Sequence, residues 1–153
     1  MNPVVESPDA AGESKRLSTA ATIHVVAGLI WQPRCRDSFL ISKRLKGKHL
    51  EDYWELPGGK TEADETPLQA LQRELIEEVD IMPLDASPYI QVCHSYEDRS
   101  ILLDVWEVKT FKGSAKALEG QEITWVAISE LDQYRFPDAD VAVLDAIKSN
   151  ALV

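Results

Sequence analysis

The sequence predicts an α/β protein in which a mixed β-sheet lies between helices. Several runs of residues are short, apolar and rich in β-branched side chains, as buried strands are. Two other segments repeat their apolar residues every three or four positions, which is typical of helices. Strands that alternate with helices favour a sheet covered by helices. A length of 153 residues suits one domain with a substantial core.

The expected elements follow a polar N-terminal segment. Residues 1–19 lack the apolar core of a signal peptide, and we expect a disordered lead-in there and a folded domain over residues 20–153. Turns are expected at Pro33–Asp37 and Glu97–Ser100. The sequence predicts five strands and a C-terminal helix, at Ile23–Trp31, Phe39–Arg44, Tyr89–Ser95, Ile101–Thr110, Glu122–Ile128 and Val141–Ser149.

The segment between the second and third strands carries the signals of a helix start. Thr66 is the expected N-cap, Pro67 occupies the first helical position, and Gln69 completes a capping box. Asp80 is expected to end the helix in the left-handed conformation, which Asp adopts at a modest energetic penalty. The inward stripe is expected to consist of Leu68, Leu71, Leu75 and Val79.

Three glutamates follow Arg73 on this predicted helix, namely Glu74, Glu77 and Glu78. Spacings of three and four residues place their carboxylates on one helical face, where their negative charges repel one another. A divalent cation prefers hard oxygen ligands and would relieve that repulsion. A solvated acidic face is the alternative interpretation.

The flanking residues complete a longer pattern: Gly, five residues, Glu, seven residues, Arg-Glu, apolar, any, Glu-Glu, any, Gly, apolar. Its matching positions are Gly59, Glu65, Arg73, Glu74, Leu75, Glu77, Glu78 and Ile81. Asp80 stands where the pattern has its last glycine. This is the Nudix box, and after Ala20 the chain resembles the Nudix hydrolases of the MutT type, which clear oxidised nucleotides from the precursor pool. The resemblance implies an α/β/α sandwich.

The resemblance also implies a set of ligands for Mg²⁺, with Mn²⁺ able to substitute: Glu74, Glu77, Glu78 and the backbone carbonyl of Gly58. Arg73 is expected to hold one glutamate through a bidentate bridge. Glu119, in the loop before the last strand, matches an additional MutT-type glutamate that binds metal or serves as the base. Glu119 could instead be a surface carboxylate, because glutamates are usually exposed.

Residues outside the box resemble MutT-type positions that contact the nucleotide: Arg44, His49, Glu55, Leu56, Pro57, Gly58, Arg99 and Asp140. Arg44 suits a phosphate group. His49 could instead be an ordinary loop histidine, and Arg99 a turn arginine.

Asp140 stands where MutT-type enzymes carry an asparagine, whose amide both donates and accepts hydrogen bonds and so matches the N7–H and O6 of oxidised guanine. An ionised aspartate only accepts, and it suits the exocyclic amino group of cytosine, as in the related CTP pyrophosphohydrolases. A protonated aspartate could make both bonds to oxidised guanine if its pKa were raised. Asp140 could also cap the C-terminal helix.

These features predict a Mg²⁺-dependent nucleoside triphosphate pyrophosphohydrolase that converts 8-oxo-dGTP to monophosphate and pyrophosphate. CTP or modified dCTP is the alternative substrate, and a nucleotide-binding Nudix domain without turnover or a purely structural domain are the alternative classes. A net charge of -10 opposes binding to nucleic-acid polymers and anionic membranes. We expect a cytoplasmic monomer or homodimer whose partner is a small nucleotide.

Overall fold

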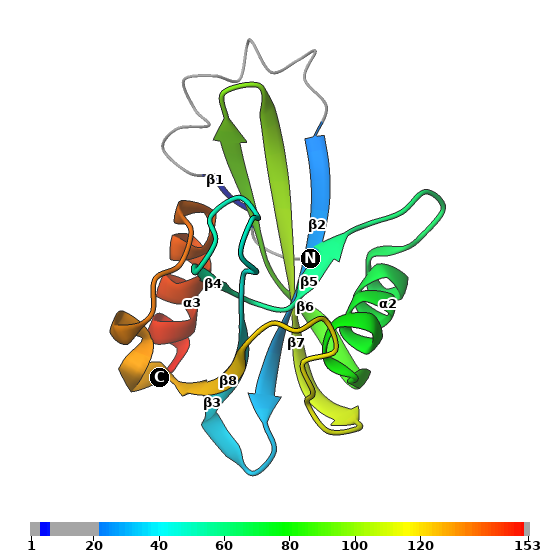
Figure 1. The fold of residues 1–153 in the computed structure, drawn as a ribbon, viewed down its shortest axis with the longest axis vertical. Helices are drawn as coiled ribbons and strands as arrows, with labels where there is room; N and C mark the ends of the chain where they lie inside the picture. The colour runs from blue at the N-terminus through cyan, green and yellow to red at the C-terminus, as the bar shows by residue number, and fades with distance from the viewer. Residues whose placement is uncertain (1–3, 7–21, 152–153) are drawn as a thin grey trace.

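The computed structural model describes residues 4–6 and 22–151, in which a central sheet separates helix α2 from helix α3 (Figure 1). The strands are β1 (Val4–Glu6), β2 (Thr22–Gln32), β3 (Cys35–Lys43), β4 (Trp54–Glu55), β5 (Gly58–Lys60), β6 (Met82–Tyr96), β7 (Arg99–Lys112) and β8 (Ile123–Ala127). The helices are α2 (Pro67–Val79), α3 (Val141–Ala151) and the 3₁₀ turns η2 (Ile128–Gln133) and η3 (Asp138–Asp140). The predicted mixed sheet between helices is confirmed.

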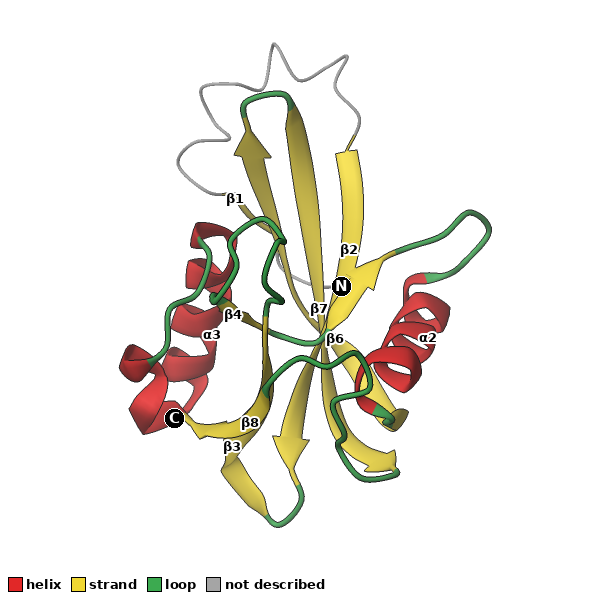
Figure 2. Cartoon of the chain, viewed as in Figure 1, coloured by secondary structure: helices red, strands yellow, loops and turns green. Residues whose placement is uncertain are grey.

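The strands lie in the order β1-β6-β7-β2-β3-β4, with β5 paired to β2 and β8 paired to β3 (Figure 2). Strands β2 and β7 run parallel, whereas β6 and β7 form an antiparallel hairpin. One edge of β2 is shared, because Val25–Ala27 pair with β5 and Trp31–Gln32 pair with β3. The short segment between β4 and β5 therefore crosses from a strand paired with β3 to a strand paired with β2.

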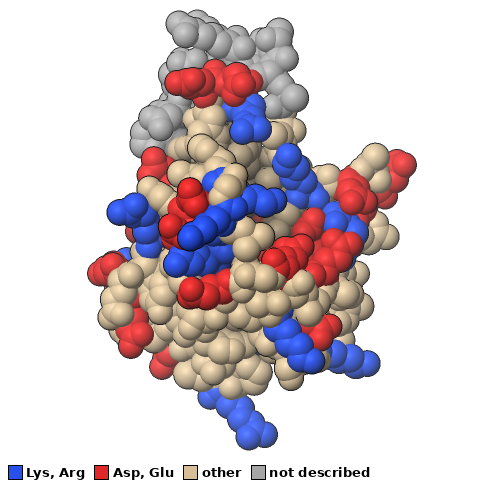
Figure 3. All heavy atoms as spheres, in the orientation of Figure 1, with Lys and Arg blue, Asp and Glu red and all other residues tan. Residues whose placement is uncertain are grey.

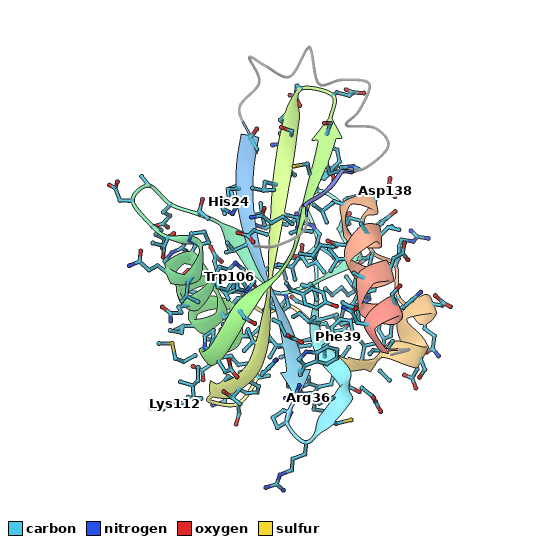
Figure 4. The ribbon with its side chains drawn as sticks, turned by 180° about the vertical axis from the view of Figure 1, so that it is seen from behind. His24, Arg36, Phe39, Trp106, Lys112 and Asp138 are labelled. Atoms are coloured by element: carbon cyan, nitrogen blue, oxygen red, sulfur yellow. The ribbon has the colours of Figure 1, made fainter. Side chains whose placement is uncertain are left out.

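Each face of the sheet carries its own apolar core. The α2 side buries Val26, Ile30, Leu71, Leu75, Val79 and Val108, and the α3 side buries Leu29, Phe39, Ile41, Val105, Val143 and Ile147. Seen from behind, Trp106 lies toward α2 and Phe39 toward α3 (Figure 4). Adjacent strand residues point to opposite faces, so β2 contributes Leu29 to one core and Ile30 to the other.

Helix α2 begins and ends as the sequence predicts. The Thr66 side chain accepts from the backbone N–H of Gln69, and the Gln69 side chain accepts from the backbone N–H of Thr66, at 3.1 and 2.9 Å. Asp80 adopts the left-handed conformation, with φ 60° and ψ 37°, and its N–H reaches back to the last helical turn. The departure from glycine in the box is thus accommodated without lengthening the helix.

The expectation that Glu74, Glu77 and Glu78 share one face of α2 needs correction, because Glu78 lies on the buried side of the helix. Glu78 is only 7 % exposed and lies with the apolar stripe, seven residues after Leu71 and three after Leu75. The side chain of Glu77, one residue earlier, is 57 % exposed. The helix therefore places one carboxylate in the protein interior and leaves its neighbour in solvent.

Strand β6 is longer than the predicted Tyr89–Ser95, because it already begins at Met82. Pro83 and Pro88 break the alternating pattern that marks a strand, and the pairing with β7 shifts register beside both prolines. Within the predicted lead-in, Val4–Glu6 pair in parallel with β6. The other residues of that segment, and residues 20–21 at the predicted start of the domain, lie outside the described part of the chain. None of the described helices has the length and apolarity needed to cross a membrane.

Candidate active site

Two glycines bring β5 close to its neighbours at the centre of the site. A Cβ atom on Gly58 would lie 2.0 Å from the backbone oxygen of Val26, so the backbones of β5 and β2 could not approach as they do. A Cβ atom on Gly59 would lie 2.5 Å from the carboxyl carbon of Glu74 on α2. Glycine at both positions lets the helix carboxylates reach the edge of β5.

Glu78 is held against this glycine pair by hydrogen bonds. Its Oε2 accepts from the backbone N–H of Gly58 at 3.0 Å, and the hydroxyl of the buried Ser42 donates a further hydrogen bond. Burial, helped by the nearby charges of Glu55 and Glu119 and opposed by the hydrogen bonds from Gly58 and Ser42, raises the pKa of Glu78 to about 8. Without a cation beside it, the Glu78 carboxyl group therefore retains its proton at neutral pH.

Arg73 serves as the counter-charge of the box carboxylates. Its guanidinium binds Glu65 through two hydrogen bonds of 2.7 and 3.0 Å, a bidentate bridge to a glutamate that the sequence analysis did not name as the partner of Arg73. The same group contacts Glu74 at 2.9 Å, Glu77 at 3.5 Å and the carbonyl of Lys60 at 3.0 Å. Hydrogen bonding to Glu65 raises the pKa of Arg73 and lowers the pKa of Glu65. Arg73 therefore links helix α2 to Lys60, the last residue of β5.

The carboxylates have the chemistry of a metal site, although they are not gathered around one point. Burial raises the pKa of Glu74, and repulsion from Glu77 and Glu119 raises it further. Such mutually repelling oxygens are the hard donors that Mg²⁺ prefers. Across residues 22–151 and 4–6, no three His, Cys, Asp or Glu side chains converge as a metal centre. Glu74 and Glu77 face Arg73, and Glu78 faces Gly58.

On the other side of the glycine pair, a pocket of about 780 Å³ opens between the sheet and η3. We call it the nucleotide-sized pocket. Most of the predicted substrate contacts line it: Arg44, His49, Glu55, Leu56, Gly58, Arg99 and Asp140. Pro57 instead accepts a hydrogen bond from the N–H of Gly28 at 2.8 Å, which anchors the segment to β2. The pocket and the box carboxylates thus meet at Gly58 and Gly59.

Arg44 is positioned at the pocket wall by two acceptors. Its Nη1 donates to Glu55 at 3.0 Å, and its Nε donates to the backbone oxygen of His49. Burial raises the pKa of Glu55, and Arg44 opposes that increase. A group of cations lies beside a band of carboxylates on this face (Figure 3), and the pocket lining includes Lys48, Lys60 and Arg99. The pocket can therefore receive an anion beside an acidic cluster.

Asp140 lines the opposite wall as the last residue of η3 and is only 9 % exposed. Burial and, to a smaller extent, the charge of Glu55 raise the pKa of Asp140 against the opposing effect of Arg44, with a net value of about 7. Tyr96 from β6 lines the same pocket, and its pKa is raised by burial and by the charge of Asp140. At neutral pH the Asp140 carboxyl group is present in both protonation states.

The sequence analysis missed several residues of the site, including Ser42, Lys48, Lys60, Tyr96 and Gln121. Ser42 lies within a predicted strand and Tyr96 directly follows one, where alternation offered no functional signal. Lys48 and Lys60 lie in or beside polar loops that resemble ordinary surface. Gln121, which is only 7 % exposed, follows Glu119 by two residues, so its proximity to a predicted site residue was the one available signal.

Comparison with known proteins identifies relatives for this arrangement. A family model described as a NUDIX domain matches residues 26–146. The 8-oxo-dGTP diphosphatase of Escherichia coli is 36 % identical over 112 residues, which cover 73 % of this chain and 87 % of that protein. The CTP pyrophosphohydrolase of the same organism is 34 % identical over 124 residues, covering 81 % and 90 % of the two chains.

A solved structure supports the same relationship. It comes from a study of MutT from Aliivibrio salmonicida and Vibrio cholerae, and it matches with a TM-score of 0.74 and 35 % sequence identity. The match covers 85 % of this chain and 99 % of that one.

Proposed function

This chain belongs to the Nudix family of hydrolases, which cleave phosphoric anhydride bonds, and on that basis we propose that its substrate is 8-oxo-dGTP. The products would be 8-oxo-dGMP and pyrophosphate, so the enzyme would remove a damaged nucleotide before DNA synthesis. The predicted class, a nucleoside triphosphate diphosphatase of the MutT type, agrees with its relatives. The predicted substrate rests on this family membership together with the site geometry.

The observation that carries the proposal is the meeting of two environments at Gly58 and Gly59. On one side lies a pocket of a size suited to a nucleotide, whose lining includes four Lys or Arg side chains and four carboxylates. On the other side lie Glu74 and the buried Glu78. A triphosphate extended from the pocket toward the glycine pair would bring its phosphates next to the carboxylates that can hold a cation.

Nudix hydrolases generally use a divalent metal ion, and we propose Mg²⁺, with Mn²⁺ as a substitute. The residues that would hold it are the predicted ones: Glu74, Glu77, Glu78, Glu119 and the carbonyl of Gly58. The ion supplies neutralisation of phosphate charge and activation of water when bound. Arg73 would keep Glu74 within reach of β5 through the hydrogen bonds that the structure contains.

The chain's own residues provide the remaining functions. Arg44, fixed by Glu55 and His49, would bind a phosphate oxygen, and Lys48 and Lys60 would add positive charge along the pocket. Leu56 and Tyr96 supply apolar surface for the base. No nucleophilic serine or cysteine is required, because water attacks the phosphorus in a reaction governed mainly by positioning and charge.

Asp140 is the proposed reader of the base. With its pKa raised to about 7, a protonated Asp140 is available at neutral pH to donate to the O6 of oxidised guanine and to accept from N7–H. The ionised form accepts only, and it fits the amino group of cytosine. The resemblance to a CTP pyrophosphohydrolase makes CTP or modified dCTP the second candidate.

The decisive experiment measures kcat/KM with Mg²⁺ for 8-oxo-dGTP, dGTP, CTP and 5-methyl-dCTP, and identifies the products. We expect 8-oxo-dGTP to have the highest kcat/KM and pyrophosphate to be released. The ratio of kcat/KM between two nucleotides measures the selectivity of the enzyme. A preference for the cytosine nucleotides would favour the second candidate. Tight nucleotide binding without turnover of any nucleotide would instead indicate a binding domain.

The proposed cellular setting follows from charge and substrate. A net charge of -10 disfavours nucleic-acid polymers as partners, while local cations allow a small phosphorylated ligand. We place the enzyme in the cytoplasm, where the nucleotide pool is available, as a monomer or homodimer.

A further inference from the structure

The loop between β7 and β8 is attached to the C-terminal end of α2. The last carbonyls of a helix have no partner within that helix and need donors from elsewhere. Here the backbone N–H of Lys116 donates to the carbonyl of Val79 at 2.9 Å, and the N–H of Leu118 donates to the carbonyl of Glu78 at 3.1 Å. The loop that carries Glu119 is thus docked on the turn that carries Glu78.

Gln121 adds a second connection through its side chain, which is only 7 % exposed. Its Nε2 donates to the same carbonyl of Glu78 at 3.0 Å, and its Oε1 accepts from the backbone N–H of Glu119 at 3.0 Å. Both ends of the amide are therefore used. Gly120, between the two loop residues, has φ +79°, a conformation that lets the chain turn back so tightly.

This arrangement links the two carboxylate-bearing residues through one buried amide. The charge of Glu119 reaches the α2 carboxylates, where it disfavours ionisation of both Glu74 and Glu78. A loop carboxylate in that position is useful only if the loop holds it against its repulsion from α2. The backbone bonds of Lys116 and Leu118 fix the first half of the loop, and Gln121 fixes Glu119 itself.

We propose that Gln121 is a positioning residue, which holds Glu119 beside Glu78 through hydrogen bonds to both; this inference rests on the proposed function, in which Glu119 takes part in hydrolysis. Glutamine suits the position because an amide carries a donor and an acceptor at the required spacing. Partners that orient the groups around a metal typically change affinity or activity by about 10- to 100-fold when they are removed.

The first test uses hydrogen exchange in the metal-free protein and needs no turnover. In the wild-type chain the amides of Glu119, Lys116 and Leu118 should all be protected, because each donates a hydrogen bond within the protein. In Gln121→Met, which keeps the side-chain volume, protection should be lost at Glu119 and retained at the other two amides. Rapid exchange at Glu119 in the wild type, or unchanged protection in the variant, would overturn the proposal.

The second test is a double-mutant cycle with Glu119→Gln, measured with 8-oxo-dGTP and Mg²⁺. We expect Gln121→Met to lower kcat by about 10-fold with little change in KM. In the Glu119→Gln background the same substitution should have no further effect, because Gln121 acts through Glu119. Lys116→Ala, in the same loop with a side chain 65 % exposed, is the matched control and should leave kcat unchanged.

The outcomes separate this inference from the function on which it rests. Additive effects in the cycle, with normal wild-type turnover, would overturn the positioning role alone. A wild-type chain that hydrolyses no nucleoside triphosphate would overturn the proposed function and this inference together. If Gln121→Met fails to fold, the wild-type exchange rate at Glu119 still decides whether the hydrogen bond exists.

Discussion

The site combines two regions that differ in how they are built. The α2 carboxylate cluster takes Glu74, Glu77 and Glu78 from one helical stretch, with Arg73 as a shared counter-charge. The nucleotide-sized pocket collects its lining from β2, the β3–β4 loop, β6, β7 and η3. A helix keeps the spacing of its residues, so the cluster suits a chemical step common to the family. In a pocket built from separate elements, a substitution in one element changes one wall and leaves the other walls in place, which suits substrate selectivity.

Glu55 connects the two regions electrostatically. It is bound by Arg44 at the pocket wall, and its charge raises the pKa of Glu78 on one side and of Asp140 on the other. A change at Glu55 would therefore alter both regions. The separation of catalysis from selectivity is therefore tested by substitutions at residues that belong to one region only.

The largest expected effect is at the buried carboxylate of the cluster. Glu78→Gln removes a charge that a cation requires, while the amide retains the size of the side chain and its acceptor for Gly58. We expect kcat/KM to fall by more than about 100-fold for every nucleotide, with the relative order of nucleotides unchanged. Glu122→Gln, whose side chain is 71 % exposed, is the control. A change in nucleotide preference would show that cluster and pocket are not separate.

A smaller loss of activity is expected from a substitution at Gly59, where β5 meets α2. In Gly59→Ala the new methyl group would overlap the Glu74 carboxylate, the flexible end of a side chain that can move aside. The chain should fold, but Glu74 should be displaced and kcat should fall by about 10-fold. Gly28→Ala is the comparison, because its methyl group meets Leu75 in the core at 3.2 Å. It should lower stability by about 1–3 kcal/mol while retaining kcat.

Selectivity should respond at Asp140 without loss of the chemical step. Asp140→Asn supplies a permanent donor and acceptor, so we expect the ratio of kcat/KM for 8-oxo-dGTP over CTP to rise by about 10-fold at pH 8. In the wild type that ratio should increase as pH falls through about 7, since Asp140 then gains its proton. In Asp140→Asn the pH dependence of the ratio should disappear. A ratio unchanged by substitution and by pH would leave Asp140 with a structural role before α3.

The smallest effect concerns the stability of the metal-free protein. The pKa of Glu78 is about 8 and that of Asp140 about 7 in the folded state, both above their ordinary values of 4.5 and 3.8. Folding therefore favours the protonated forms, and this contribution is complete below the ordinary values and is lost as pH rises to about 8. We expect the metal-free Tm to fall by a few degrees between pH 5 and 8.

Mg²⁺ should oppose that loss, because it binds the ionised carboxylates of the folded state. Thermal unfolding at several pH values, with EDTA and with Mg²⁺, measures the fall of Tm with pH and the increase of Tm by Mg²⁺. Glu78→Gln should make both changes smaller. A Tm that rises with pH in EDTA would contradict the assignment of a buried, protonated Glu78.

The features that could be predicted were local in the sequence. Thr66, Pro67 and Gln69 set the start of α2, and Asp80 ends it in the predicted conformation. A bidentate bridge from Arg73 to a glutamate was expected from the box, and the structure forms one with Glu65, eight residues earlier. The strands with regular apolar runs were located to within a few residues, whereas β6 was truncated in the prediction by Pro83 and Pro88.

The sequence by itself determined the family, the helix with its caps and the identity of the carboxylates, because these depend on spacing along one element. Only the tertiary structure decided which carboxylate is buried, since the environment of Glu78 comes from β3 and β5. It also brought Asp140 opposite Arg44 and placed Gln121 against α2. Burial and long-range charge set these properties, and both depend on atoms that are distant in sequence.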